Sequence, residues 1–149
     1  QDTFFMLLVH PAFTKHLDGR EMGLHSVVDI VDWIRTQPCK WRSVCAALEL
    51  NGVRTAAWAA LRWVQLLTFP HAPAGLEAML ADTQPGRLRR AWLDCWLRND
   101  LSTRTSAIHS ARLLGLSLLL HDTPGDAVRA FAGWQRARRR RAVDLLAFR

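Results

Sequence analysis

Histidines near the start of the chain are the first residues that could carry chemistry. His10, His16 and His25 are separated by gaps of six and nine residues. A helical metal site usually takes two ligands four residues apart, so that both side chains reach one ion from the same face. Pro11 also interrupts any helix between the first two histidines. We therefore predict no metal site and interpret these histidines as helix-end or core residues with satisfied hydrogen bonds.

Acidic residues are the second candidates. Two-metal nucleotidyl transfer needs paired carboxylates that hold ions against the attacking and leaving oxygens, and an Asp-x-Asp sequence usually supplies two of them. The chain has no Asp-x-Asp, no Walker A loop and no Gly-x-Ser-x-Gly elbow. Asp29 and Asp32 recur at helical spacing, which is typical of a solvated face or of partners for nearby arginines. The sequence thus predicts no complete catalytic centre.

An arginine block near the C-terminal end is the strongest charge feature, in a chain of net charge +7 with eighteen Arg and two Lys. Such a block could bind RNA, DNA or nucleotide phosphates by charge and bidentate hydrogen bonds. Consecutive residues point around a helix, however, and no aromatic residues interleave for base stacking. A solvated helix face and a partner subunit or domain therefore stay open as alternatives. The candidate anion-binding residues are Arg136, Arg138, Arg139, Arg140 and Arg141.

The cysteines indicate a reducing compartment. Cys39, Cys45 and Cys95 make an odd number and form no C-x-x-C pair, so a disulfide framework is not expected. Cys45 and Cys95 fall on apolar helical stripes and are predicted to be buried, inert thiols. The longest apolar stretch, residues 113–120, is far shorter than the roughly 20 residues of a membrane span. We expect a cytoplasmic protein with no membrane partner.

The elements that must position these residues are all predicted to be helices. Gly, Pro and polar clusters divide the chain, and apolar residues recur at helical spacing between them. The prediction is an all-α, irregular bundle of seven or eight helices in a single helical domain over residues 1–149. The predicted helices cover residues 2–17 with an interruption at Pro11, then 24–36 with Ser26 as cap, 40–50, 53–67, 74–81, 85–98, 105–121 and 126–146.

Packing faces can also be predicted. In residues 40–50 one stripe carries Trp41, Val44, Cys45 and Leu48, and Asn51-Gly52 is expected to end that helix with a left-handed cap. The alanines of residues 53–67 would let a neighbouring helix approach closely. Two further helices are expected to point inward with Leu88, Trp92, Cys95 and Trp96, and with Ile108, Leu113, Leu116 and Leu120.

Four stretches of the first half also resemble a known family. In order, they are Phe4-Phe-Met-Leu-Leu-Val-His-Pro-Ala-Phe-Thr-Lys-His16, Ser26-Val-Val-Asp-Ile-Val-Asp32, Trp41-Arg-Ser-Val-Cys-Ala-Ala47 and Gly52 to Leu67. Together they resemble the helical C-terminal part of the uncharacterised bacterial nucleotidyltransferase family, in the polymerase-β-like superfamily. The chain departs from that pattern at Pro11 and at Arg42, where an acidic residue is more typical, and it lacks the catalytic Gly-Ser turn with its carboxylates.

The resemblance implies an accessory role. His10 and His16 match the two histidine positions of the family and Asp29 its aspartate, which makes them candidate substrate-site or structural polar residues. The chain would pack on, or shape the substrate site of, the catalytic domain of a parent protein. That domain would use Mg²⁺ and NTP, whereas no cofactor is expected here. A start at Gln1 agrees with a fragment of a larger protein. The alternative is a non-enzymatic interaction module that binds protein or nucleic acid through the arginine-rich last helix.

Overall fold

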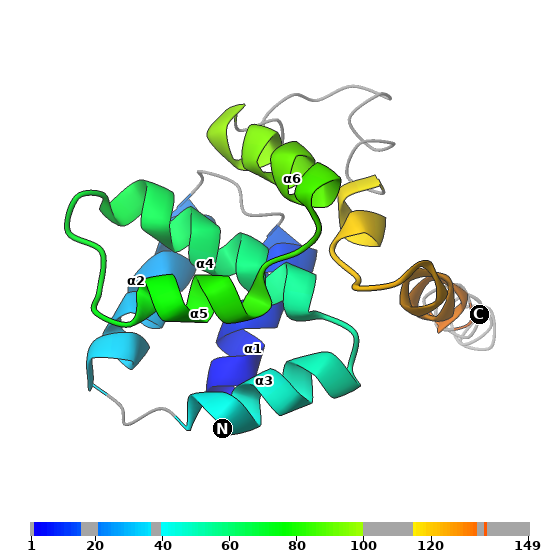
Figure 1. The fold of residues 1–149 in the computed structure, drawn as a ribbon, viewed down its shortest axis with the longest axis horizontal. Coiled ribbons are helices and arrows are strands. Elements are labelled where there is room, and N and C mark those ends of the chain that lie inside the picture. The colour runs from blue at the N-terminus through cyan, green and yellow to red at the C-terminus, as the bar shows by residue number, and fades with distance from the viewer. Residues whose placement is uncertain (1, 16–20, 37–39, 100–114, 134–135, 137–149) are drawn as a thin grey trace, which may run out of the picture.

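Helices account for the regular structure of this computed structural model, which describes residues 2–15, 21–36, 40–99, 115–133 and 136. No strand occurs in these ranges, so the predicted all-α bundle is confirmed (Figure 1). The elements are α1 (Asp2–His10), the π-helix η1 (Pro11–Lys15), α2 (Glu21–Thr36), α3 (Trp41–Leu50), α4 (Arg54–Thr68), α5 (Leu76–Thr83) and α6 (Arg87–Asn99). Residues 115–119 and 124–133 are helical as well.

The first two helices show one confirmed and one wrong prediction. α1 ends at His10 and Pro11 begins the wider π-helical turn, because proline has no N–H to donate and its ring clashes one turn back. The predicted cap Ser26 is wrong. α2 already begins at Glu21, so Ser26 lies more than one turn inside the helix, past the first-turn N–H groups that a cap would satisfy.

The turn between α3 and α4 has the predicted left-handed glycine. Gly52 has φ +64°, and its N–H donates to the carbonyl of Glu49 at 3.0 Å. The N–H of Val53 donates to the carbonyl of Leu48, also at 3.0 Å, which completes a Schellman motif. Two otherwise unpaired carbonyls at the end of α3 are thereby satisfied. This turn places α4 back against α3.

Helix α4 is the centre of the bundle (Figure 1). It contacts α1, η1, α2, α3, α5 and α6. Because neighbours cover most of it, most of its circumference is apolar, as expected for a largely enclosed helix. The predicted close approach at its alanines is confirmed, since all four are fully buried. The buried residues of α4 are Thr55, Ala56, Ala57, Trp58, Ala59, Ala60, Leu61, Trp63 and Val64.

Aromatic contacts hold α1 against α2 and α3. Phe4 is fully buried and stacks on Trp33, with ring centroids 5.8 Å apart and planes 7° from parallel. Trp41, at the start of α3, meets the same ring at 6.4 Å in an edge arrangement. In α3 itself Val44 and Leu48 are buried, which confirms the predicted stripe at its centre.

The inward face of α6 was predicted only in part. Trp96 is buried as expected, but Leu88 is 90% exposed, Trp92 is 39% exposed and Cys95 is exposed. The side that packs on the bundle instead carries Leu93 and Leu97 beside Trp96. The helix has apolar side chains on two sides, and only one of them meets α4. We call the exposed side, made of Leu88, Trp92 and Cys95, the outer stripe.

The segment after residue 114 packs on the bundle. Leu116 and Leu120 are fully buried, as predicted, whereas Ile108 and Leu113 lie outside the described residues. The last described helix begins at residue 124, two residues before its predicted start. Thr123 and Asp126 form a capping box there: the Asp126 N–H donates to Thr123 Oγ1 at 3.1 Å, and the Thr123 N–H donates to Asp126 Oδ2 at 3.2 Å.

Candidate functional site

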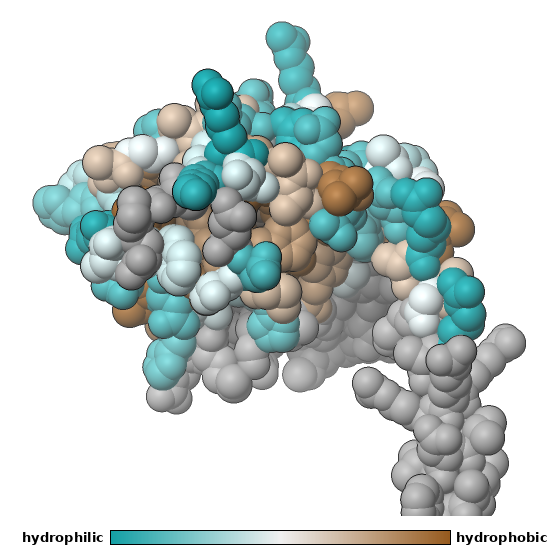
Figure 2. Space-filling view, turned by 90° about the horizontal axis from the view of Figure 1, so that it is seen from below, coloured by the Kyte–Doolittle hydropathy of each residue, from teal (hydrophilic) through white to brown (hydrophobic). Residues whose placement is uncertain are grey.

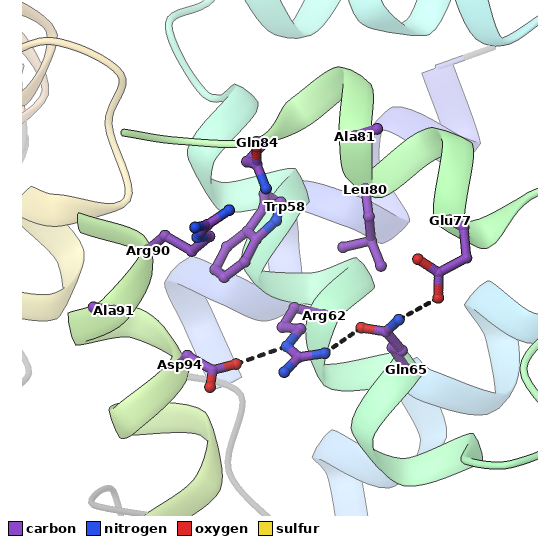
Figure 3. A pocket seen from close by; sticks show the side chains of 10 residues that line it. All are labelled: Trp58, Arg62, Gln65, Glu77, Leu80, Ala81, Gln84, Arg90, Ala91 and Asp94. Carbon is purple, nitrogen blue, oxygen red and sulfur yellow. Dashed lines mark hydrogen bonds and ion pairs between the residues drawn. The ribbon is translucent and has the colours of Figure 1, made fainter. Parts of the chain in front are cut away.

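A cleft between α4, α5 and α6 is the candidate site (Figure 3). Its volume is about 440 Å³, within the range of small-molecule sites. Helix α4 supplies its floor, α5 one wall and α6 the other. The lining residues are Trp58, Arg62, Gln65, Glu77, Leu80, Ala81, Gln84, Arg90, Ala91 and Asp94.

A chain of polar contacts crosses one end of the cleft. Arg62 Nε donates to Asp94 Oδ1 at 2.7 Å, which ties α4 to α6. Arg62 also donates to the amide oxygen of Gln65, whose nitrogen donates in turn to Glu77 of α5 (Figure 3). Arg98 Nε reaches the other oxygen of Asp94 at 2.5 Å. Each group at this end therefore has a partner within the fold.

Charge pairing sets the ionisation of Asp94. Burial by itself would raise the pKa of this carboxyl, because desolvation disfavours the charged form. The hydrogen bonds and positive charges of Arg62 and Arg98 outweigh burial, and the pKa lies below its usual value. Asp94 is thus a carboxylate that links helices, rather than a proton donor near neutral pH.

Polar donors without partners gather at the other end of the cleft. The side chains of Arg90 and Gln84 point toward the indole of Trp58 (Figure 3). Trp58 is only 4% exposed. Within the described residues none of these three side chains makes a hydrogen bond or an ion pair. The two ends of the cleft therefore differ: one is saturated and the other offers free N–H groups.

A second polar cluster anchors the start of α4. The carboxylate of Asp122 accepts hydrogen bonds from the N–H of Arg54 at 2.9 Å and the N–H of Thr55 at 2.7 Å. The hydroxyl of Thr55 donates to the same carboxylate at 2.8 Å. An acceptor with negative charge at a helix N-terminus satisfies unpaired N–H groups and complements the helix dipole. A residue far along the chain thus caps the central helix.

Arg89 joins α6 to the same cluster. Its guanidinium donates to the carbonyl of His121 at 2.9 Å and to that of Asp122 at 2.8 Å. Thr55 Oγ1 lies 3.4 Å from the same nitrogen. Arg89 is a partly buried residue on the packed side of α6, so its charge is used to hold the segment that caps α4.

His121 lies beside this cluster and packs on Phe13, with ring centroids 5.0 Å apart. Its Nδ1 is buried and has no hydrogen-bond partner among the described residues. Burial lowers the pKa of the imidazole, and the negative charges of Asp126 and Asp122 offset this only in part. The ring is therefore neutral near pH 7 and serves packing.

The site residues predicted from the sequence lie elsewhere. The side chains of His10 and Asp29 are exposed, as is Asp32, so the predicted solvated face of α2 is confirmed. His16 lies outside the described residues. Arg136 is exposed, and its Nε donates to the carbonyl of Ala132 at 3.3 Å. The other residues of the arginine block, Arg138, Arg139, Arg140 and Arg141, also lie outside the described residues.

The cysteine predictions need one correction. Cys95 is exposed, not buried, because it belongs to the side of α6 that does not meet α4. Cys45 is half-buried, and Cys39 lies outside the described residues. In the described ranges no three His, Cys, Asp or Glu side chains come together in a way that could hold a metal ion. No helix in those ranges is both long enough and apolar enough to cross a membrane.

Sequence reasoning missed the cleft itself. Asp94 and Arg98 stand four residues apart, and this spacing indicates an ion pair on one helix. Nothing comparable signals that Arg62 of α4 joins them, since the pairing depends on how α4 and α6 cross. Trp58 has the pattern of an ordinary core residue. Its free N–H becomes evident only when its neighbours are known.

Comparison of the chain with family models, with curated proteins and with solved structures finds no match.

Proposed function

We propose that this chain is an accessory helical domain of a nucleotidyltransferase-like protein, and that it packs on the catalytic domain through the outer stripe of α6. The observation that carries this proposal is the exposure of Leu88 and Trp92 on a helix whose other side is well packed. A leucine and a tryptophan one turn apart offer a large apolar area that water does not favour. Partner surfaces are enriched in such aromatic anchors.

The opposite side of the molecule has a different character. Seen from below, it shows hydrophilic and near-neutral side chains around small, separate hydrophobic patches (Figure 2). Helix α6 lies at the other edge of the bundle (Figure 1). Scattered apolar residues are normal on a protein surface, whereas a helical stripe is a better docking face. The outer stripe is therefore the face that we assign to the partner domain.

Two further points support a catalytic domain as that partner. The four stretches of residues 4–67 resemble a family in which such helices follow a nucleotidyltransferase domain. The carboxylates of the cleft and of the Asp122 cluster also have structural partners: Asp94 pairs with arginines, and Asp122 caps α4. Nucleotide transfer would then need carboxylates from the partner.

The first test separates the roles of the two domains. The isolated chain is incubated with Mg²⁺ and each of the four NTPs, and nucleotide transfer to water, protein and RNA acceptors is measured. We expect no transfer above the background without protein. Metal-dependent transfer by the isolated chain would contradict the accessory role.

The second test addresses the docking face. The double variant Leu88→Gln, Trp92→Gln is made in the polypeptide that joins this chain to its catalytic domain. Its transfer activity should be lower by about tenfold or more, as expected when anchor residues are removed. The matched control is Leu50→Gln, Phe69→Gln, which changes one aliphatic and one aromatic residue that are 88% and 82% exposed. Equal activity in both variants would refute docking through the outer stripe.

A further inference from the structure

We propose that the cleft between α4, α5 and α6 binds a small molecule through an oxyanion, a carboxylate or a phosphate group, which the indole N–H of Trp58 and the guanidinium of Arg90 receive. This inference does not depend on the docking role proposed for the outer stripe. It rests on the contrast between the two ends of the cleft.

The buried indole is the first observation. Trp58 is 4% exposed, yet its N–H has no hydrogen-bond partner among the described residues. The fully buried indole N–H groups without a partner among the described residues are those of Trp33 and Trp96, so the Trp58 N–H keeps some exposed area and is open to an acceptor. Trp58 lines the cleft, so an acceptor in the cleft can satisfy it.

The charge of Arg90 is the second observation. Its guanidinium lies beside the Trp58 ring (Figure 3), and its side chain forms no ion pair or hydrogen bond within the described part of the chain. Arg90 is only partly exposed. The arginine at the other end, Arg62, is already matched by Asp94. The positive charge available to a ligand is therefore concentrated at the Trp58 end.

The remaining lining sets the orientation of the ligand. The amide of Gln84 also points toward Trp58 and adds a donor (Figure 3). Glu77, bonded to Gln65, places a carboxylate of α5 at the far end and would repel a second anionic group there. Leu80 and Ala81 supply apolar wall between the two ends. The geometry thus favours a molecule with one oxyanion and an uncharged body over a molecule with two oxyanions.

Seven tryptophans make total fluorescence a poor probe, but each indole N–H gives its own NMR signal. The signal that disappears in Trp58→Phe identifies Trp58. Phenyl phosphate and benzoate are then titrated separately into the ¹⁵N-labelled wild-type chain, with benzyl alcohol as the uncharged control. We expect a saturable shift of the Trp58 indole signal with at least one of the anions and none with benzyl alcohol.

The roles of the arginines are tested with two variants of α6. Arg90→Gln should weaken binding of the anion about tenfold or more, because a charge-assisted hydrogen bond contributes roughly 1.5–3 kcal/mol. Arg87→Gln is the matched control, since Arg87 is exposed on the same helix and does not line the cleft. The proposal is overturned if neither anion shifts the Trp58 signal, if benzyl alcohol shifts it equally, or if both variants weaken binding to the same extent.

Discussion

Helices α4 and α6 each carry two tryptophans, and they have two and four arginines respectively, but they use these residues differently. Trp58 and Trp63 of α4 are both 4% exposed, whereas in α6 Trp96 is 1% exposed and Trp92 39%. Helix α4 is surrounded by neighbours, and α6 packs mainly on α4. Enclosure makes most positions of α4 from Thr55 to Val64 part of the core, while α6 divides its surface into a packed side, a cleft side and an outer side. A helix at the edge of a bundle can thus stabilise the fold and still offer surfaces for binding.

The largest effect should come from the enclosed helix. Leu61 of α4 is fully buried, and Leu61→Ala should reduce the free energy of unfolding by about 2–5 kcal/mol, through lost burial and the cavity left behind. Urea denaturation followed by circular dichroism measures this. Leu50→Ala, at an exposed position of α3, is the control and should change stability by about 0.5 kcal/mol or less. Similar losses in the two variants would break the distinction between enclosed and edge positions.

The turn that leads into α4 provides the second comparison. A Cβ on Gly52 would lie 2.5 Å from the Asp126 carboxylate, and its φ of +64° already disfavours a side chain. Gly75 has φ +85° but nothing within 4 Å of a Cβ. Gly75→Ala should therefore cost about 1 kcal/mol for the backbone alone. Gly52→Ala should cost at least about twice as much in the same denaturation experiment. Equal losses of unfolding free energy in the two variants would mean that the Asp126 side chain moves away from the new Cβ without loss of stability.

Capping of α4 should have a smaller effect. Asp122→Ala removes the acceptor for two backbone N–H groups and the Thr55 hydroxyl, and should lower the free energy of unfolding by about 1–2 kcal/mol. Asp29→Ala changes an exposed aspartate of α2 and serves as control, with an expected change within about 0.5 kcal/mol. A neutral Asp122→Ala variant would show that α4 does not depend on the distant segment.

The smallest effect concerns pH. Burial lowers the pKa of His121 in the folded chain below its usual 6.5, so below that pH the unfolded state binds more protons than the folded state. The stability that the folded chain gains from a neutral His121 is fully present above pH 6.5. It is lost as the pH falls through the lowered pKa. The melting temperature should therefore fall between pH 7 and pH 5, and the fall should be reduced in His121→Phe. The control is His71→Phe, which changes an exposed histidine. In this variant the full fall in melting temperature should remain.

The sequence predicts the enclosed centre of the bundle better than the helix at its edge. The helix order, the break at Pro11, the Gly52 turn and the alanine-rich centre were predicted, because each depends on local spacing or on a helix that is apolar on nearly every side. The side of α6 that packs on α4 was predicted only in part. The apolar residues of this helix lie on two sides, and their spacing does not indicate which side a neighbour covers. Ser26 failed as a cap because the helix continues past it toward Glu21.

The cleft was beyond prediction for a related reason. Its contacts join residues 32 positions apart, as in Arg62–Asp94, and 12 apart, as in Gln65–Glu77. Such pairs depend on how three helices cross. Trp58 and Arg90 have free donors because no acceptor among their neighbours in the described part of the fold pairs with them. A sequence pattern does not indicate which residues will be neighbours. The arginine site, by contrast, was suggested by residue type alone, and the candidate histidines by the resemblance of the first half of the chain to a known family.

The central claim is that α6 packs on the bundle with one side and exposes the other, and a matched pair of leucines tests it directly. Leu93 is 1% exposed and Leu88, on the same helix, is 90% exposed. In urea denaturation of the isolated chain, Leu93→Ala should cost about 2–5 kcal/mol, and Leu88→Ala about 0.5 kcal/mol or less. If Leu88→Ala were the more costly of the two, the outer stripe would be part of the core, and both the packing of α6 and the docking face assigned to it would be contradicted.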